Sequence, residues 1–281
     1  DDVDAVFILS GRWFGPLPIL AACEHGKAVY CCPSWDCQSV QLAGLKKRID
    51  EAGIAFMADF PRRVAPATLR LKELIATRLG RPRLLFCHFR QPLGAPAKTV
   101  ANGHLHPIGP EAASEHRLLE LIDWCHYVVG QHTTSVNGFW HRAAAGTHSD
   151  YQTVSMDFSA RGELGQGPLA QLSCGSYMPS TWPEAISFRP PAALQVCCEN
   201  GVAFVDLPST LIWFDAAGRH LESLEHERPA SEQLLWQFHR QVTSLIRDRT
   251  NMEDVFAALE TLERARQSFR EVRRVFMDEN S

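Results

Sequence analysis

The sequence lacks any apolar run long enough to cross a membrane, which takes about 18–20 consecutive apolar residues. It also lacks a basic excess, because 28 Lys and Arg stand against 32 Asp and Glu, a formal net charge of -4. Nucleic acids and anionic membranes are bound through broad positive fields. We therefore expect a soluble, cytoplasmic protein with small-molecule or protein partners, no nucleic acid and no membrane. Residues upstream of Asp1 could still carry an export signal.

Paired cysteines at CxxC spacing, which are typical of zinc sites, are absent. The chain has nine cysteines, an odd number, in a length that needs no covalent stapling. Two adjacent pairs occur, Cys31 with Cys32 and Cys197 with Cys198. Neighbouring strand residues point to opposite faces of a sheet, so we expect that the two thiols of neither pair bind the same metal ion. The sequence predicts reduced thiols and no metal site.

Apolar strands and helices alternate over the first 82 residues. The run AVFIL at residues 5–9 is wholly apolar, as a strand covered on both faces should be. Such alternation indicates a parallel sheet with right-handed crossovers. We expect strands at 5–9, 27–32 and 54–60, and helices near 17–26, 34–52 and 65–80.

The pattern changes after residue 82. A strand at 83–89, a Gly/Pro-rich loop at 91–110 and a helix at 110–130 precede a series of short strands with turn signals at 200–201 and 217–218. Two amphipathic helices, at 231–249 and 251–275, close the chain. We predict an α/β protein: a partial Rossmann-like parallel sheet in residues 1–82, then an α+β domain in 83–281 with a large, mostly antiparallel open sheet.

Several segments, in order, resemble the glucose-fructose oxidoreductase / inositol dehydrogenase (Gfo/Idh/MocA) family: DVDAVFI, EHGKAVYC-P, LKELIATRLGRP, LIDWCHYVVG and ENGVAFVDLP. The resemblance covers nearly the whole chain. It implies NAD or NADP as cofactor, a sugar or polyol as substrate, and a homo-oligomer built through the open sheet.

No GxGxxG occurs in the sequence. The family places its first strand and this glycine-rich turn, which aim a helix terminus at the pyrophosphate, in a segment that would precede residue 1. DVDAVFI resembles the family's fourth strand. We expect an amino-terminally truncated chain, with a natural protein lacking that half as the alternative.

The resemblance assigns the cofactor side of the site to two strand ends. Ser10 takes the place of a family hydroxyl, Trp13 could stack on a flat ring or cap the sheet edge, and Arg12 departs from the family pattern. The family's GKxVxxEKP becomes GKAVYC-CP, which keeps Pro33 and leaves Cys32 nearest to the family lysine. A thiol cannot supply that positive charge.

Compensation for the missing lysine would need a cation from another segment. Arg12, Arg62 and Arg63 are the candidates, and Arg62 is the one we assign to the cofactor side. All three could equally be ordinary ion-pair residues.

The family's catalytic helix places its acid and base groups here on His116, Glu120 and Asp123. Their spacing puts all three on one helix face, where a histidine beside a carboxylate could relay a proton. An exposed His–Glu helix pair is the equal alternative.

Two functions remain open from the sequence. The first is an NAD(P)-dependent oxidoreductase acting on a hydroxyl group of a sugar, polyol or related compound. The second is a catalytically inactive relative retained for binding or assembly, because both the family lysine and the family histidine are replaced. Fold alone does not decide between them.

Overall fold

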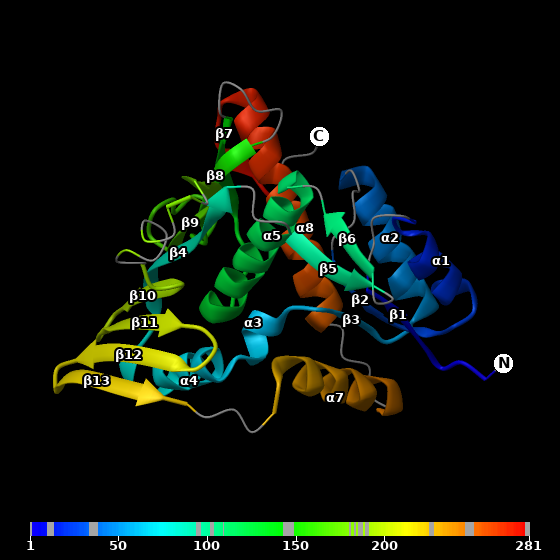
Figure 1. Ribbon diagram of the computed structural model, residues 1–281, viewed down its shortest axis with the longest axis horizontal. Helices are drawn as coiled ribbons and strands as arrows, with labels where there is room; N and C mark the ends of the chain where they lie inside the picture. Colours follow the sequence, from blue (N-terminus) through cyan, green and yellow to red (C-terminus); the bar gives the residue numbers. More distant parts are fainter. Residues whose placement is uncertain are drawn as a thin grey trace.

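The computed structural model forms a small parallel sheet, a large mixed sheet and a two-stranded hairpin (Figure 1). The residues that the structure describes are 2–9, 14–33, 39–93, 97–101, 104–108, 110–142, 149–179, 181–182, 184, 188, 191–224, 228–244 and 250–278. The predicted fold class is confirmed.

The parallel sheet has the order β1 (Ala5–Ile8), β2 (Ala28–Cys31), β3 (Phe56–Ala58). Helices α1 (Leu17–Glu24) and α2 (Ser39–Ala52) make the crossovers between them. Residues 34–38, where the second helix was expected to begin, lie outside the described residues. The alternating apolar runs therefore predicted this part correctly.

Both faces of the parallel sheet are covered, by different helices. Phe56 of β3 packs against Phe256 of α8 (Thr250–Glu271), with ring centroids 6.3 Å apart. On the other face Tyr30 packs against Phe238 of α7 (Ala230–Thr243) at 5.5 Å. In β1, however, Phe7 remains 48% exposed. This strand is therefore less completely buried than its wholly apolar sequence predicts.

The large sheet has nine strands, in which β4 pairs with β9 in parallel and all other pairings are antiparallel. Its strands, in spatial order, are β13 (Gly218–Ser223), β12 (Thr210–Asp215), β11 (Val202–Asp206), β10 (Leu194–Cys198), β4 (Pro82–Leu93), β9 (Leu169–Pro179), β8 (Ser149–Asp157), β7 (Ser135–Arg142) and β14 (Val275–Phe276).

One face of this sheet is covered by α4 (Pro66–Leu74), α5 (Pro110–Val129) and α8 (Figure 1). The inward-facing members of β4, β9 and β10 are buried, as in Leu85, Leu172 and Val196. Trp124 of α5 is fully buried, and its indole Nε1 donates to Thr68 Oγ1 of α4 at 3.0 Å. The core therefore holds α5 against both the sheet and α4.

Three expectations need correction. The loop expected at 91–110 contains a hairpin of β5 (Ala97–Ala101) and β6 (His104–Ile108), because apolar and polar residues alternate there between the prolines. The last helix ends at Glu271, and the chain then pairs with β7 as β14. The sheet also gains β13, whose polar sequence gave no strand signal.

The helix predicted at 65–80 is present, and parts of two other predicted elements lie outside the described residues. The helix at 65–80 is α4 extended by a π-helical turn, η1 (Ile75–Leu79), and Gly80 ends it with a φ of 75°. Residues 186–190, which belong to the predicted series of short strands, lie mostly outside the described residues, and so do residues 245–249 at the end of the helix predicted at 231–249. A short helix, α3 (Pro61–Val64), begins directly after β3.

Close packing of α8 on β7 depends on Gly138. A Cβ added there would lie 2.3 Å from the Ala265 carbonyl oxygen. Because backbone cannot yield as a flexible side chain does, Gly138→Ala should lower the free energy of unfolding by about 1–3 kcal/mol, measured by urea denaturation.

Gly44 on α2 is the matched control. No described atom lies within 4 Å of its ideal Cβ. Gly44→Ala should therefore raise the free energy of unfolding by about 0.5–1 kcal/mol, as expected for a helix interior. Equal effects of the two substitutions would contradict this account of the α8–β7 contact.

Candidate functional site

Charged side chains gather where the parallel strands end and meet α5. Asp59 directly follows β3, and Arg62 and Arg63 follow on α3. The amino-terminal half of α5 contributes His116 and Glu120. Ligands of open parallel sheets bind outside the carboxyl ends of the strands. This cluster is therefore the candidate site.

Glu120 is the carboxylate at its centre. Its Oε2 lies 3.5 Å from Arg62 Nε, and its Oε1 lies 3.5 Å from His116 Nε2. Burial pushes its pKa upward, but His116 and Arg62 together outweigh burial and lower the pKa. Glu120 is therefore an anion held between two donors at distances longer than good hydrogen bonds.

Asp59 differs from Glu120 in its electrostatics. Its Oδ1 accepts a hydrogen bond of 3.0 Å from the Tyr30 hydroxyl. Burial raises its pKa, the charge of Glu120 adds to the rise, and the Tyr30 bond and the charge of His116 only partly oppose it. The site thus combines one stabilised carboxylate with one that is costly to ionise.

Arg117 brings a second guanidinium to the cluster. It lies over the Phe89 ring at 4.4 Å and donates to Gln91 Oε1. Burial lowers its pKa, and the nearby charge of Arg62 contributes to the lowering. Two cations are therefore held close to each other at this end of α5.

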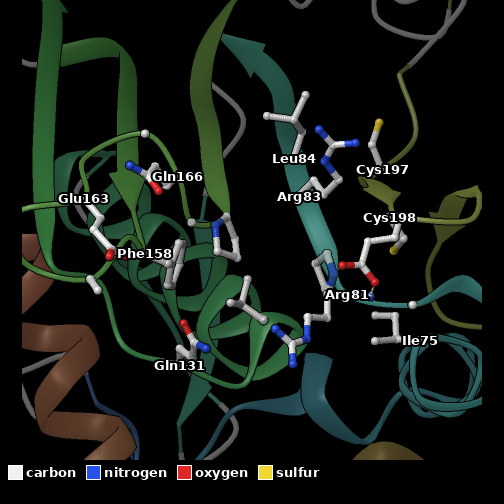
Figure 2. Close-up of a pocket in the computed structure, with 18 of the residues that line it drawn as sticks. Ile75, Arg81, Arg83, Leu84, Gln131, Phe158, Glu163, Gln166, Cys197 and Cys198 are labelled. Atoms are coloured by element: carbon white, nitrogen blue, oxygen red, sulfur yellow. Dashed lines mark hydrogen bonds between the residues drawn. The ribbon is translucent and has the colours of Figure 1, made fainter.

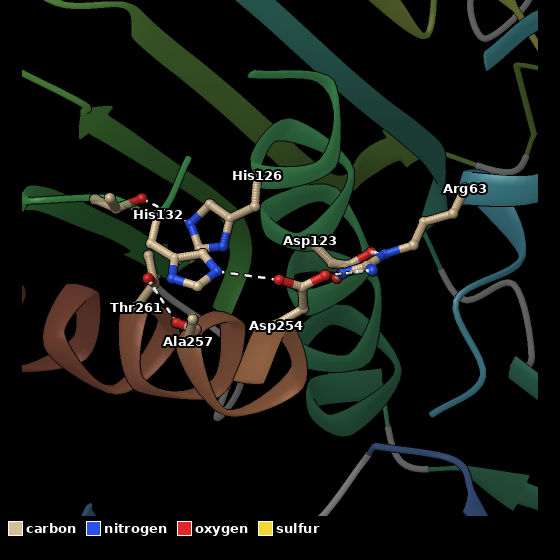
Figure 3. A network of polar contacts seen from close by, with 8 residues as sticks. Arg63, Asp123, His126, His132, Asp254, Ala257 and Thr261 are labelled. Carbon is tan, nitrogen blue, oxygen red and sulfur yellow. Dashed lines mark hydrogen bonds and ion pairs between the residues drawn. The ribbon is translucent and has the colours of Figure 1, made fainter. Parts of the chain in front are cut away.

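A second network, of hydrogen bonds and ion pairs, lies about one helical turn from Glu120 along α5 and joins three helices (Figure 3). Arg63 donates to both carboxylate oxygens of Asp123, from Nε at 2.8 Å and also from Nη2. Its Nη1 donates to Asp254 Oδ2 of α8 at 2.7 Å. Asp254 Oδ1 in turn lies 3.1 Å from His132 Nε2. One guanidinium therefore connects α3, α5 and α8.

Burial and charge act in opposite directions within this network. Asp123 is completely buried, and burial raises its pKa to about 6 although Arg63 opposes the rise. Burial also opposes the charge on Arg63, but Asp123 and Asp254 outweigh it and raise the arginine pKa. Such a network is stable only while every member keeps its partner.

His126 lies beside the network but stays uncharged. Its Nε2 lies 2.7 Å from Thr133 Oγ1, and its ring is 5.6 Å from that of His132. Burial, with a smaller contribution from His132, lowers the pKa of His126 to about 3. It is therefore neutral at physiological pH.

The sequence-predicted site residues are only partly brought together. His116, Glu120 and Arg62 meet, and Asp123 lies one helical turn away with both oxygens engaged by Arg63. Cys32 is half-buried and Pro33 buried after β2. The expected Ser10, Arg12 and Trp13 lie outside the described residues.

Sequence reasoning missed four contributors to these two clusters. Arg63 was considered only as a substitute cation, and Asp59, Arg117 and Asp254 gave no motif signal. Asp59 could have been found because it is the polar residue directly after a buried strand. Asp254 could not, because its contact with Arg63 spans 191 positions.

A separate groove of about 1,490 Å³ lies past the carboxyl end of α5 (Figure 2). Arg81 and Arg83 at the start of β4 face the 158–168 segment across it.

Among the described residues no three His, Cys, Asp or Glu side chains are arranged to hold a metal ion. No described helix is long and apolar enough to span a bilayer. None of the eight cysteines in the described ranges forms a disulfide.

Comparison with known proteins identifies the fold of the chain. No family model and no curated protein sequence matches the chain significantly. Solved structures do match over nearly its whole length. The chain has the fold of the Gfo/Idh/MocA oxidoreductases.

Three of these structures illustrate the match. An oxidoreductase from Agrobacterium radiobacter, in complex with NAD+, L-tartaric acid and magnesium, is 13% identical with a TM-score of 0.75, over 99% of this chain and 81% of that one. An aldose-aldose oxidoreductase from Caulobacter crescentus, complexed with glycerol, is 15% identical with a TM-score of 0.76, over 98% and 79%. An NAD binding oxidoreductase from Klebsiella pneumoniae is 15% identical with a TM-score of 0.74, over 99% and 81%.

Removal of Arg63 tests the network behind the site. Arg63→Met leaves the fully buried Asp123 without its partner, so the free energy of unfolding should fall by about 3–5 kcal/mol in denaturant titrations. The double variant Arg63→Met/Asp123→Leu removes the stranded charge and should recover at least half of the loss. A single-variant cost below about 1 kcal/mol, the usual value of a surface pair, would contradict this account.

Proposed function

We propose that the protein is an NAD(P)-dependent oxidoreductase that acts on a hydroxyl group of a sugar, polyol or related compound. Residues 1–82 would hold the nucleotide and residues 83–281 the substrate. The observation that carries the proposal is the Arg62–Glu120–His116 cluster at the carboxyl end of β3 in a chain with this fold. NAD and NADP remain alternatives.

Two orphaned atoms support a ligand at this cluster. Arg62 Nε and His116 Nδ1 are buried and have no hydrogen-bond partner among the described residues. Buried polar groups are nearly always satisfied by protein, water or ligand. A polyhydroxylated substrate supplies the acceptors and donors that these two nitrogens lack, so the residues present fit the proposed group.

The chain's residues account for the proton. A nicotinamide cofactor supplies the hydride acceptor when bound. As the substrate carbon gives up its hydride, the hydroxyl proton passes to His116 Nδ1 and a carbonyl forms. His116 is oriented for this because its Nε2 faces the Glu120 carboxylate.

Arg62 takes the part of the family lysine in this proposal. Its guanidinium stabilises the negative charge that develops on the substrate oxygen. Asp123 is a positioning residue: it engages Arg63, the neighbour of Arg62 on α3, with both oxygens. Cys32 and Pro33 at the end of β2, with Ser10, Arg12 and Trp13, would border the cofactor.

The alternative is a catalytically inactive protein that keeps the fold for binding or assembly. Cys32 favours it, because a half-buried thiol stands where the family has a lysine. The two proposals differ in a measurable way, because only the oxidoreductase needs a nicotinamide nucleotide.

Nucleotide binding and the His116 variant separate these two functions. Titration with NADH and with NADPH should change nicotinamide fluorescence for at least one of them. In a subsequent screen of sugars and polyols, His116→Ala should lower kcat by about 10²–10⁴ without preventing nucleotide binding. The exposed His25 supplies the control, and His25→Ala should retain full activity. Failure of both nucleotides to bind would favour the inactive alternative.

We also propose that the outer face of the large sheet joins a second copy of the chain. This face carries exposed apolar side chains on several strands, among them Leu84, Leu169 and Phe214. Exposed apolar surface of this kind marks an interaction site.

Light scattering tests the assembly directly. The protein should be a dimer or larger, and Phe214→Lys should shift it toward the monomer because a charge is then buried at the contact. Trp236, which is also exposed but lies on α7, is the control: Trp236→Lys should leave the mass unchanged. A monomeric wild-type protein would contradict the assembly.

A further inference from the structure

Two guanidinium groups, those of Arg62 and Arg117, lie near Glu120 in the site. Arg62 and Arg117 are two permanent cations, and they influence each other closely enough that Arg62 contributes to lowering the pKa of Arg117. Only one carboxylate of the cluster, Glu120, has a lowered pKa. Asp59 resists ionisation, since burial raises its pKa. Arg63 forms ion pairs with Asp123 and Asp254, so its charge is already matched by theirs.

Aromatic rings hold both guanidinium groups by their faces. Arg62 lies over Trp124 at 5.3 Å, and Arg117 lies over Phe89 at 4.4 Å. A stacked guanidinium keeps its N–H donors in the ring plane, where they can form the fork that matches a carboxylate. Arg117 donates one hydrogen bond to Gln91 Oε1, and Arg62 Nε makes only the long ion pair of 3.5 Å with Glu120.

We propose that Arg117 binds a substrate carboxylate beside the Arg62–Glu120 pair, and that the substrate is a hydroxy acid of the sugar series rather than a neutral polyol. The inference rests on the proposed function for the hydroxyl chemistry. The planar guanidinium fork of Arg117, held over Phe89 beside the Arg62–Glu120 pair, matches the geometry of a carboxylate. A phosphate dianion fits less well, because it would add a second negative charge beside Glu120 and Asp59.

The neighbouring groups suit the rest of such a substrate. Asp59 and Tyr30, which are joined by a hydrogen bond of 3.0 Å, are polar partners for sugar oxygens. His116 and Glu120, which carry the proposed proton transfer, lie four positions apart on one face of α5. A substrate with its carboxylate at Arg117 would extend its hydroxyl-bearing carbons along the face formed by Glu120 and His116.

D-Gluconate and D-glucitol test the subsite as a matched pair. They share a six-carbon polyol chain and differ only in carboxylate against hydroxymethyl at C1. Isothermal titration of the protein without nucleotide should show gluconate binding about tenfold or more tightly than glucitol. Because no nucleotide is present, this result does not depend on the redox proposal.

Arginine variants show which side chain causes the preference for gluconate over glucitol. Arg117→Gln should reduce the gluconate-to-glucitol affinity ratio to within about twofold, and Arg117→Lys, which keeps charge but not the fork, should give an intermediate ratio. Arg83 is exposed at the opposite end of β4, so Arg83→Gln makes the same charge change and should leave the ratio unchanged.

The outcomes are distinguishable. Equal affinities for gluconate and glucitol, or a preference that survives Arg117→Gln, would overturn the carboxylate subsite while leaving the oxidoreductase proposal intact. Gluconate selectivity that depends on Arg117 in a protein that binds neither NADH nor NADPH would support the subsite and defeat the redox function.

Discussion

The hydrogen-bonded ion pairs of Arg63 with Asp123 and Asp254 are the constraint on which the rest of the site depends. They join α3, which follows the parallel sheet, to α5 and α8, which cover the large sheet. Because Asp123 is fully buried, its charge is tolerated only with the guanidinium in place. The interaction therefore fixes the distance between the strand ends and α5.

Arg62 owes its position to this neighbour. The four-residue α3 is too short to be stable through its own hydrogen bonds, so the anchored Arg63 sets its orientation. Arg62 then reaches Glu120 at 3.5 Å, and Glu120 approaches His116 at the same distance. Both contacts are long, and Arg62 Nε and His116 Nδ1 have no hydrogen-bond partner among the described residues, which is the state expected of a site shaped to receive a ligand.

The sequence predicted what depends on local pattern. The apolar runs placed the parallel strands, and the helical spacing placed His116 and Glu120 on one face of α5. It could not show that Arg63 meets Asp254 across 191 positions, or that Phe89 of β4 lies under Arg117, because these contacts arise only when the two sheets pack around α5. The hairpin at 97–108 was missed because its prolines and glycines read as loop.

Hydrogen–deuterium exchange tests the location of the site most directly. The protein should be compared alone and with saturating NADH and D-gluconate. The account predicts slower exchange of the amides at 58–63 and 114–120, and no change at 158–168 beside the separate groove. Protection confined to that groove, or unchanged exchange at the end of β3 with both ligands bound, would contradict the assignment of the site.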